Sequence, residues 1–255
     1  MTLSSHRSSF RFLPWLFLAV VLVFLYLPLV PPVLNSLAPG SDTGLFGHYR
    51  AITQSSILME GIQKTWVLGV LTALITPLFA LAIAAAIRAW KVPRLLVGLI
   101  LIPLFVPGVS MGVATAIFFR LLGLDPSLLT MTIVHVLWTL PFSTLLLLTI
   151  MASYDRVYTE AAYMLGASPW HAFFEIELPQ IHQGLLGASI FALILSFNET
   201  IRTSLVQGGH NTVQSYIWSQ YQQVGLSGTL YALMTLLIIL TLLLIGLLAW
   251  IDRQK

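Results

Sequence analysis

Apolar residues in this chain are gathered into long runs, and polar residues mark the segments that separate them. A helix needs about 20 apolar residues to cross a hydrocarbon layer that is roughly 30 Å thick. Runs of this length predict membrane-spanning helices at residues 12–34, 65–87, 95–119, 128–152, 184–206 and 229–250. We therefore expect an all-α fold in which residues 1–255 form one transmembrane domain with six spans.

The composition supports the same interpretation. Apolar residues make up 58% of the 255 residues and charged residues only 8%, whereas a soluble domain carries about 25% charged residues. So few charges cannot cover a water-exposed surface, so lipid must surround most of the chain. The chain contains no cysteine, which excludes disulfide bonds, thiolate metal ligands and cysteine nucleophiles.

The first apolar run resembles a secretory signal peptide, because Arg7 and Arg11 precede it. The run is longer than the roughly 7–15 apolar residues of a signal-peptide core. We therefore predict that it is retained as a membrane anchor.

Lysine and arginine are divided unequally between the two sides that six spans would define. One side would carry Arg7, Arg11, Arg88, Lys91, Arg94, Arg156, Arg253 and Lys255. The other side would carry Arg50, Lys64 and Arg120. Because basic residues concentrate in cytoplasmic loops, we expect both termini and the loop at residues 153–183 to lie in the cytoplasm.

Several prolines fall inside the first four predicted spans, where each removes a helical hydrogen bond. They are Pro14, Pro28, Pro77, Pro103, Pro107 and Pro141. Two interpretations remain open: bends that fit neighbouring helices together, or hinges and broken helices around a translocation route. Gly108 and Gly112 form a pair of small residues that favours close helix packing.

The loop between the fourth and fifth spans has the pattern of two short helices joined by a bend. Thr159 is expected to cap the first helix and Gly166 to end it. Ser168 and Pro169 are typical of a second helix start, and Leu178-Pro179 is expected to end that helix before the next span. Such a bent pair could cap the bundle or fill a groove on a soluble partner, and helix physics alone does not choose between these uses.

The spacing of particular residues in this loop favours the second use, contact with a soluble partner, because it resembles a known family. Glu160-Ala161-Ala162, then Gly166, then Ile176-x-Leu178-Pro179 resembles the "EAA" loop of binding-protein-dependent ABC importer permeases. The resemblance implies a cytoplasmic coupling helix that inserts into a cleft of an ATPase subunit. The implied coupling residues are Glu160, Ala161, Ala162, Gly166, Ala167, Ile176, Leu178 and Pro179.

The order of spans and two further segments narrow the resemblance. Residues 195–199 (Leu-Ser-Phe-Asn-Glu) and 205–208 (Leu-Val-Gln-Gly) are similar to the second permease subunit of spermidine/putrescine-type importers. This implies a bacterial inner-membrane protein whose solute is a polyamine or another small amine or zwitterion. The implied partners are ABC ATPase subunits, a homologous second permease and an extracytoplasmic substrate-binding protein.

Two charged residues, Glu199 and Arg202, fall inside the fifth predicted span, where an unpaired charge costs about 2.5–3.5 kcal/mol. Because they are three residues apart, they could neutralise each other on one helical face. Alternatively, Asn198, Glu199 and Arg202 could line the solute pathway. His135 lies in the fourth span, and we expect it to form a hydrogen bond between helices, since no second histidine lies at metal-ligand spacing.

The chain lacks the phosphate-binding GxxxxGK[ST] pattern, so ATP and magnesium would bind to the partner ATPase. We therefore predict a non-catalytic permease subunit with no catalytic residue, metal site or cofactor of its own. The alternative is an ion- or proton-coupled secondary transporter that uses Glu199, Arg202 and His135. A membrane-embedded enzyme is disfavoured because no nucleophile–base pair or metal-ligand set is evident.

Overall fold

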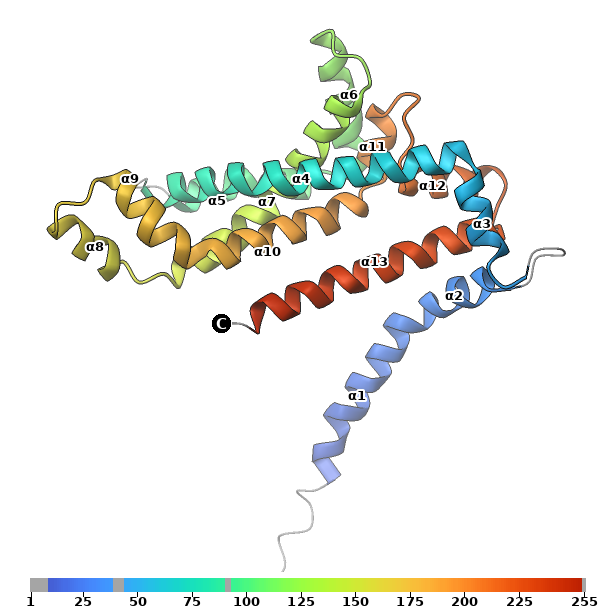
Figure 1. The fold of residues 1–255 in the computed structure, drawn as a ribbon, viewed down its shortest axis with the longest axis horizontal. Helices are drawn as coiled ribbons and strands as arrows, with labels where there is room; N and C mark the ends of the chain where they lie inside the picture. Colours follow the sequence, from blue (N-terminus) through green and yellow to red (C-terminus); the bar gives the residue numbers. More distant parts are fainter. Residues whose placement is uncertain (1–8, 39–43, 90–92, 254–255) are drawn as a thin grey trace, which may run out of the picture.

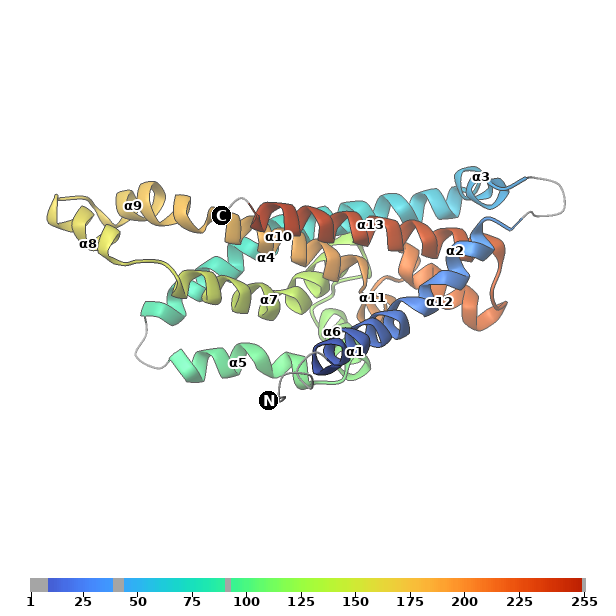
Figure 2. The same ribbon diagram turned by 90° about the horizontal axis from the view of Figure 1, so that it is seen from below.

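The computed structural model describes residues 9–38, 44–89 and 93–253, without the side chains of residues 9–12, 93 and 252. Its regular elements are helices, and most of the long ones lie roughly along one axis (Figures 1 and 2). The prediction of an all-α fold is confirmed. Arg7, Lys91, Lys255 and the side chain of Arg11, which entered the count of basic residues, lie outside the described part.

Four predicted spans form continuous helical segments. The first consists of α1 (Ser9–Tyr26), a 3₁₀ turn (Leu27–Leu29) and α2 (Val30–Ser36). The second, fourth and sixth are α4 (Ser56–Ala89), α7 (Leu128–Ala152) and α13 (Gly228–Asp252). Side-chain oxygens of Ser127 and Ser227 cap α7 and α13 by accepting the backbone N–H three residues later.

The third predicted span, residues 95–119, is not one helix, and of the two interpretations left open for its prolines the structure contains the broken helix. It is divided into α5 (Pro93–Phe105) and α6 (Gly108–Leu121), which meet at an angle of 99°. Pro107 lies in the break with φ −53° and ψ 136°. Proline has no amide hydrogen and disfavours helical geometry in the residue before it, so Val106 and Pro107 interrupt the helix. Pro14, Pro77 and Pro141, by contrast, lie inside unbroken helices.

The fifth predicted span is wrong at both ends. A π-helical turn (Phe173–Glu177) joins α9 (Pro169–Ala172) to α10 (Leu178–Phe197), so Leu178-Pro179 does not end the preceding helix. Pro179 falls in the first turn of α10, where proline is tolerated. At the other end the helix stops at Phe197, and α11 (Ile201–Val206) begins after three residues.

The core of the molecule lies between α4, α7 and α10, which make extensive contacts with one another. Small side chains on α4 and α10 allow close approach, and larger ones on α7 fill the space between them. The fully enclosed members of this cluster are Ala80, Ala84, Leu147, Met151, Ile181 and Ala188. These helices associate because their side chains fit closely together. Hydrophobicity alone gives no preference for protein over lipid, since lipid tails are as apolar as leucine.

The two ends of the long helices carry different short helices (Figures 1 and 2). α3 (Gly47–Gln54) and α12 (Val213–Gln223) lie at one end and pack with α13 around Ile52, Ile217 and Leu233. α8 (Val157–Met164) and α9 lie at the opposite end. The two ends of the bundle are therefore built from different short helices.

α1 lies apart from the bundle, and Figure 1 shows it extending away from α13. No side chain from Leu13 to Asn35 is buried, whereas Ser36 at the end of α2 is. Trp15 and Phe24 expose 71% and 78% of their surface. The apolar surface of α1 is therefore available to lipid or to another membrane protein.

Candidate coupling surface and solute pathway

The first short helix of the predicted coupling loop, α8, begins without the expected threonine cap. Its first residue is Val157, whose N–H donates to the Asp155 carboxylate at 3.0 Å. Thr159 lies inside the helix, and its hydroxyl is hydrogen-bonded to the Tyr154 hydroxyl. The prediction that Thr159 caps α8 is therefore wrong, because the helix begins two residues before Thr159, with Arg156 at the N-cap position and the Asp155 carboxylate accepting the first N–H.

The end of α8 has the hydrogen-bond pattern of a Schellman motif. Gly166 adopts a φ of +86°, and its N–H donates to the carbonyl of Tyr163 at 3.0 Å. The N–H of Ala167 donates to the carbonyl of Ala162 at 3.0 Å. The prediction that Gly166 ends this helix is confirmed, since positive φ is the geometry that glycine adopts at little cost.

The next helix starts as the sequence predicts. The Ser168 hydroxyl accepts the N–H of His171 at 3.3 Å, and Pro169 occupies the first turn. α8 and α9 are thus two short helices joined at a sharp bend, and we call residues 157–172 the elbow. Through the π-helical turn, the second half of the elbow continues directly into α10.

The elbow exposes large apolar side chains to its surroundings. Met164 and Leu165 expose 88% and 89% of their surface, and Trp170 exposes 74%. The Trp170 ring stacks on that of Phe174 with 5.9 Å between centroids. An exposed apolar patch of this kind is typical of a contact surface for another protein.

The predicted coupling residues divide into two groups. Glu160, Ala161, Gly166 and Pro179 are exposed. Ala162 is buried, and Ala167, Ile176 and Leu178 are half-buried. Leu178 packs against the core cluster of α4, α7 and α10. The exposed group is available to a partner, whereas the buried group holds the elbow on the bundle.

Glu199 and Arg202 form a buried ion pair at the break between α10 and α11. The carboxylate accepts the Arg202 guanidinium at 2.7 Å and the Arg202 backbone N–H at 2.8 Å. Only 5% of the Glu199 side chain and 11% of the Arg202 side chain are exposed. Mutual neutralisation, one of the two interpretations from the sequence, is therefore what the structure contains.

Asn198, the third predicted pathway residue, is separated from this pair. Its side chain is exposed, and its amide donates to the carbonyl of Ile194 at 2.8 Å. Asn198 borders a groove of about 490 Å³ between the first span and α13. The groove is lined by Tyr26, Leu29, Pro32, Asn198, Gln214, Ile217, Met234, Leu237, Ile238, Thr241, Leu242 and Ile245.

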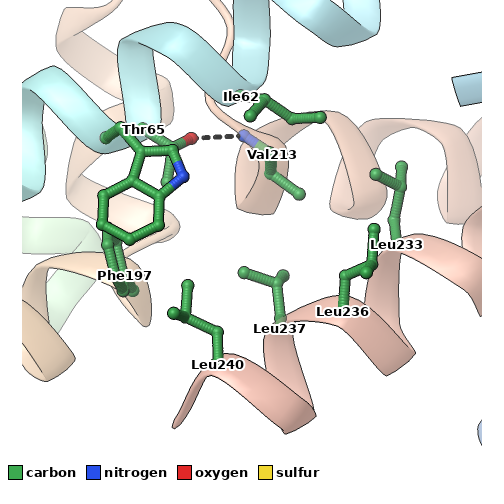
Figure 3. A pocket seen from close by; sticks show the side chains of 9 residues that line it. Ile62, Thr65, Phe197, Val213, Leu233, Leu236, Leu237 and Leu240 are labelled. Atoms are coloured by element: carbon green, nitrogen blue, oxygen red, sulfur yellow. Dashed lines mark hydrogen bonds between the residues drawn. The ribbon is translucent and has the colours of Figure 1, made fainter. Parts of the chain in front are cut away.

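A second cavity, of about 240 Å³, lies between α4, α10, α12 and α13 and is almost wholly apolar (Figure 3). Leu236, Leu237 and Leu240 point into it from α13, opposite Phe197 and Ile62. The Thr65 hydroxyl at its edge already accepts the N–H of Val213 at 2.9 Å. This cavity therefore offers little to a polar solute.

His135 forms the predicted hydrogen bonds between helices. Its ring nitrogens lie 2.7 Å from the hydroxyl oxygens of Ser196 on α10 and Thr203 on α11. The Thr203 hydroxyl also contacts the carbonyl oxygen of Glu199 at 3.2 Å. His135 on α7 therefore spans the break between α10 and α11, and only 1% of its surface is exposed.

Gly108 and Gly112 bring α6 against α11, as their spacing predicts. A Cβ atom at Gly112 would lie 2.6 Å from Leu205 Cδ1 and 3.3 Å from the backbone Cα of Arg202. A Cβ atom at Gly108 would lie 3.4 Å from the Arg202 guanidinium. The broken third span thus packs on the broken fifth span through these two glycines.

Comparison with known families decides the class of protein. A family model described as "binding-protein-dependent transport system inner membrane component" matches residues 78–255, which include the elbow, both halves of the fifth span and α13. The chain belongs to this family. It is a multi-pass, non-catalytic permease subunit of an ABC importer, and family membership favours ATP-driven import over the ion-coupled alternative.

Curated relatives cover most of this permease. A spermidine/putrescine transport system permease protein PotC homolog from Mycoplasma pneumoniae is 28% identical over 89% of the chain and 86% of the relative. PotC from Escherichia coli is 23% identical over 94% of the chain and 93% of the relative. The putrescine permease protein PotI from Escherichia coli is 26% identical over 93% of the chain and 90% of the relative.

Solved structures share the fold of the permease. A chain of a bacterial ABC transporter for the acidic polysaccharide alginate matches with a TM-score of 0.69 and 15% identity, over 98% of each chain. A chain of an amino acid ABC transporter matches with a TM-score of 0.61 and 16% identity, over 81% of the permease and 98% of that chain. The same fold therefore occurs in an ABC transporter for amino acids and in one that imports an acidic polysaccharide.

Sequence reasoning missed a contact of the permease at the base of the elbow. Arg88 on α4 is ion-paired with Glu177 in the π-helical turn and lies 5.8 Å from the Tyr154 ring centroid. Arg88 entered the sequence analysis only as a cytoplasmic charge, and Glu177 is the unspecified position in Ile176-x-Leu178-Pro179. The opposite charges were visible in the sequence, but a separation of 89 residues hid their proximity.

Proposed function

We propose that the permease forms a solute route together with a homologous second permease and that its elbow docks on a separate ATPase subunit. The observation that carries this proposal is the elbow itself. It presents Met164, Leu165 and Trp170 outward at a sharp bend and continues through the π-helical turn into a core helix. A partner that grips the bend can thus act on the spans. ATP and magnesium would be bound by that partner.

The elbow and both termini are proposed to lie in the cytoplasm of a bacterial inner membrane. Arg88 ends α4, Arg94 begins α5, Arg156 precedes α8 and Arg253 follows α13. These elements end or begin on the side of the molecule that carries the elbow (Figures 1 and 2). Basic residues concentrate on the cytoplasmic side of membrane proteins, which supports this orientation.

The solute is proposed to be a polyamine or another small amine or zwitterion, delivered by an extracytoplasmic substrate-binding protein. Support comes from the curated relatives, whose names refer to spermidine and putrescine. Asn198 would contact the solute in the groove, where Gln214 and Thr241 add further polar atoms. Glu199 and Arg202 would shape the pathway from behind Asn198, since their charges are engaged with each other.

The proposed cycle uses the elbow as the moving contact. Binding of ATP would close the two ATPase subunits, displace the elbow and shift the helices from an inward-open to an outward-open arrangement. Solute released by the binding protein would enter the route and pass inward after hydrolysis. ATP can shift the equilibrium between the inward-open and outward-open arrangements only as far as it binds more tightly to one of them than to the other.

Affinity purification of the full permease in mild detergent tests the partner proposal. A P-loop ATPase and a second permease should co-purify, and Gly166→Asp in the elbow should lose the ATPase while the second permease remains. A complex that lacks any ATPase, or a Gly166→Asp complex that retains it fully, would contradict docking at the elbow.

Transport in proteoliposomes tests the energy source. Uptake of labelled putrescine, with purified binding protein present, should require ATP on the side of the membrane where the ATPase lies. The uptake should persist after an ionophore dissipates the membrane potential. The Asn198→Leu permease serves as a matched comparison for the solute route. Uptake that disappears with the potential at constant ATP would instead support the ion-coupled alternative.

A further inference from the structure

The base of the elbow contains a contact between three separate segments. Arg88 lies in the last turn of α4, Glu177 lies at the end of the π-helical turn, and Tyr154 follows α7 by two residues. The guanidinium is ion-paired with the Glu177 carboxylate and lies 5.8 Å from the centroid of the Tyr154 ring. One side chain therefore connects the ends of α4, α7 and α10.

The contact is shielded from solvent. Only 20% of the Arg88 side chain and 15% of the Glu177 side chain are exposed. Charge-assisted hydrogen bonds that are partly buried are stronger than exposed ion pairs, which contribute little. Ala84, Met151 and Ile181, three or four residues away along the three segments, belong to the buried core cluster, so the pair lies close along the chain to the packed core.

The segment that Arg88 holds is a place where a helix can yield. In a π-helical turn the hydrogen bonds run from residue i to residue i+5, and such turns occur often at functional sites. Phe173–Glu177 lies between the exposed part of the elbow and α10. A force applied to α9 reaches α10 along the chain through this turn, where it could be absorbed by a change in helix register.

A hollow of about 340 Å³ beneath the elbow makes such yielding sterically possible. It lies between the end of α4, α8 and the π-helical turn. Arg88, Tyr154 and Glu177 form part of its wall, and Arg156 and Glu160 on the elbow side bring the other charges that face it. The Arg88–Glu177 pair thus joins α4 to the π-helical turn at the wall of this hollow.

We propose that the Arg88–Glu177 ion pair, seated on Tyr154, is a strut that makes the elbow and the α4–α7–α10 core move as one body. Arg88 and Glu177 are then positioning residues that transmit ATPase movement to the spans without contacting nucleotide or solute. This inference rests on the proposed docking of an ATPase at the elbow, because only then is a force applied there.

The test measures a distance across the strut. Because the chain has no cysteine, cysteines introduced at the exposed Val157, at the opposite end of α8 from Met164 and Leu165, and at the exposed Leu74 on α4 can carry spin labels at defined places. In the complete detergent-solubilised complex, the distance between the labels should be the same without nucleotide and with bound ATP and vanadate. With Arg88→Ala or Glu177→Gln, ATP and vanadate should shift and broaden that distance.

Two variants separate the strut from a general loss of stability. Arg88→Glu combined with Glu177→Arg should restore the fixed distance, whereas Arg88→Glu alone should not. Arg94→Ala removes an exposed arginine at the start of α5 and should leave the distance unchanged. In the Arg88→Ala and Glu177→Gln permeases, putrescine uptake per ATP hydrolysed should also fall by about tenfold, the effect of losing one buried charge-assisted hydrogen bond.

Different results would contradict the strut and the proposed docking of the ATPase. A nucleotide-independent distance in Arg88→Ala, or a charge reversal that fails to restore the distance, would overturn the strut. Loss of the ATPase from the Arg88→Ala complex would also overturn it, since the residue would then act in assembly. A wild-type complex that contains no ATPase would contradict the docking proposal itself, whatever the Arg88 variants do.

Discussion

The guanidinium of Arg202 lies 3.8 Å from the centroid of the Trp138 ring. Trp138 belongs to α7 and Arg202 to α11, so this contact attaches the short helix after the break to a core helix. A desolvated cation–π contact contributes about 2 kcal/mol. Together with the Glu199 carboxylate, the ring gives the guanidinium partners on two sides and makes Arg202 a fixed part of the bundle.

Breaking the Glu199–Arg202 pair from one side should destabilise the permease. Arg202→Leu leaves a carboxylate buried without its cation, and we expect a loss of about 3–5 kcal/mol in the free energy of unfolding. The measurement is thermal unfolding of the purified permease in detergent, with Arg94→Ala as a charge-matched control on the surface.

The double variant Glu199→Leu with Arg202→Leu should recover much of that loss, because neither charge then remains unpaired. If Arg202→Leu unfolds at the wild-type temperature and only solute uptake falls, the pair acts in the pathway and not in the fold.

Gly166 should be required for its backbone conformation and not for its small size. Its φ is +86°, and no heavy atom lies within 4 Å of a Cβ built at this position. Gly166→Val should therefore destabilise the elbow by about 1–2 kcal/mol, while Gly166→Asn should cost less, because asparagine tolerates positive φ. Protease accessibility of the elbow in the isolated permease measures the difference, and equal accessibility in the two variants would contradict the conformational explanation.

Gly112 should be required for space. A Cβ atom there would contact Leu205 and the backbone of Arg202, and overpacking of this kind costs about 1–3 kcal/mol. Gly112→Ala should lower the thermal unfolding temperature, whereas Gly98→Ala, where no heavy atom lies within 4 Å, should not. A stable Gly112→Ala permease would show that α6 and α11 can separate without loss.

Asn198 should affect transport without affecting stability. Its side chain is exposed to the groove and holds no other helix in place. Asn198→Leu should reduce labelled putrescine uptake about tenfold or more, the loss expected for a hydrogen-bonding group in a binding site, while the unfolding temperature stays at the wild-type value. Asn35→Leu, an exposed asparagine that does not line the groove, should leave uptake unchanged.

The spans and the bend of the elbow could be predicted because local rules govern them. A run of apolar residues must form its own hydrogen bonds in lipid, and this fixed α7 at residues 128–152 as expected. Gly166, Ser168 and Pro169 act on the residues next to them, so the stop and restart were visible in the sequence. The start of α8 was misplaced by three residues, because both Thr159 and Asp155 carry side-chain oxygens that can accept an N–H at a helix start.

A broken helix was one of the two interpretations left open for the prolines, including Pro107 in the third span, whereas the break at Asn198–Thr200 in the fifth span was not predicted. Pro107 ends a helix, whereas Pro77 and Pro141 lie inside helices that continue. The difference lies in the surroundings, since neighbouring helices can hold a proline-containing helix straight or stabilise its interruption. At Asn198–Thr200, His135 and Trp138 from α7 hold the two halves in place.

The sequence by itself determined that this chain is a membrane protein. It also determined the positions of most spans and the loop that resembles a coupling loop, because the length of apolar runs and the residues of turns act over short stretches of chain. Only the tertiary structure decided which charges neutralise each other and which face a groove. Glu199 and Arg202 could equally have faced a solute until Trp138 and the glycines of α6 enclosed them. Arg88 and Glu177 became a pair only when the ends of α4 and α10 met, since burial and ion pairing depend on segments that are distant along the chain.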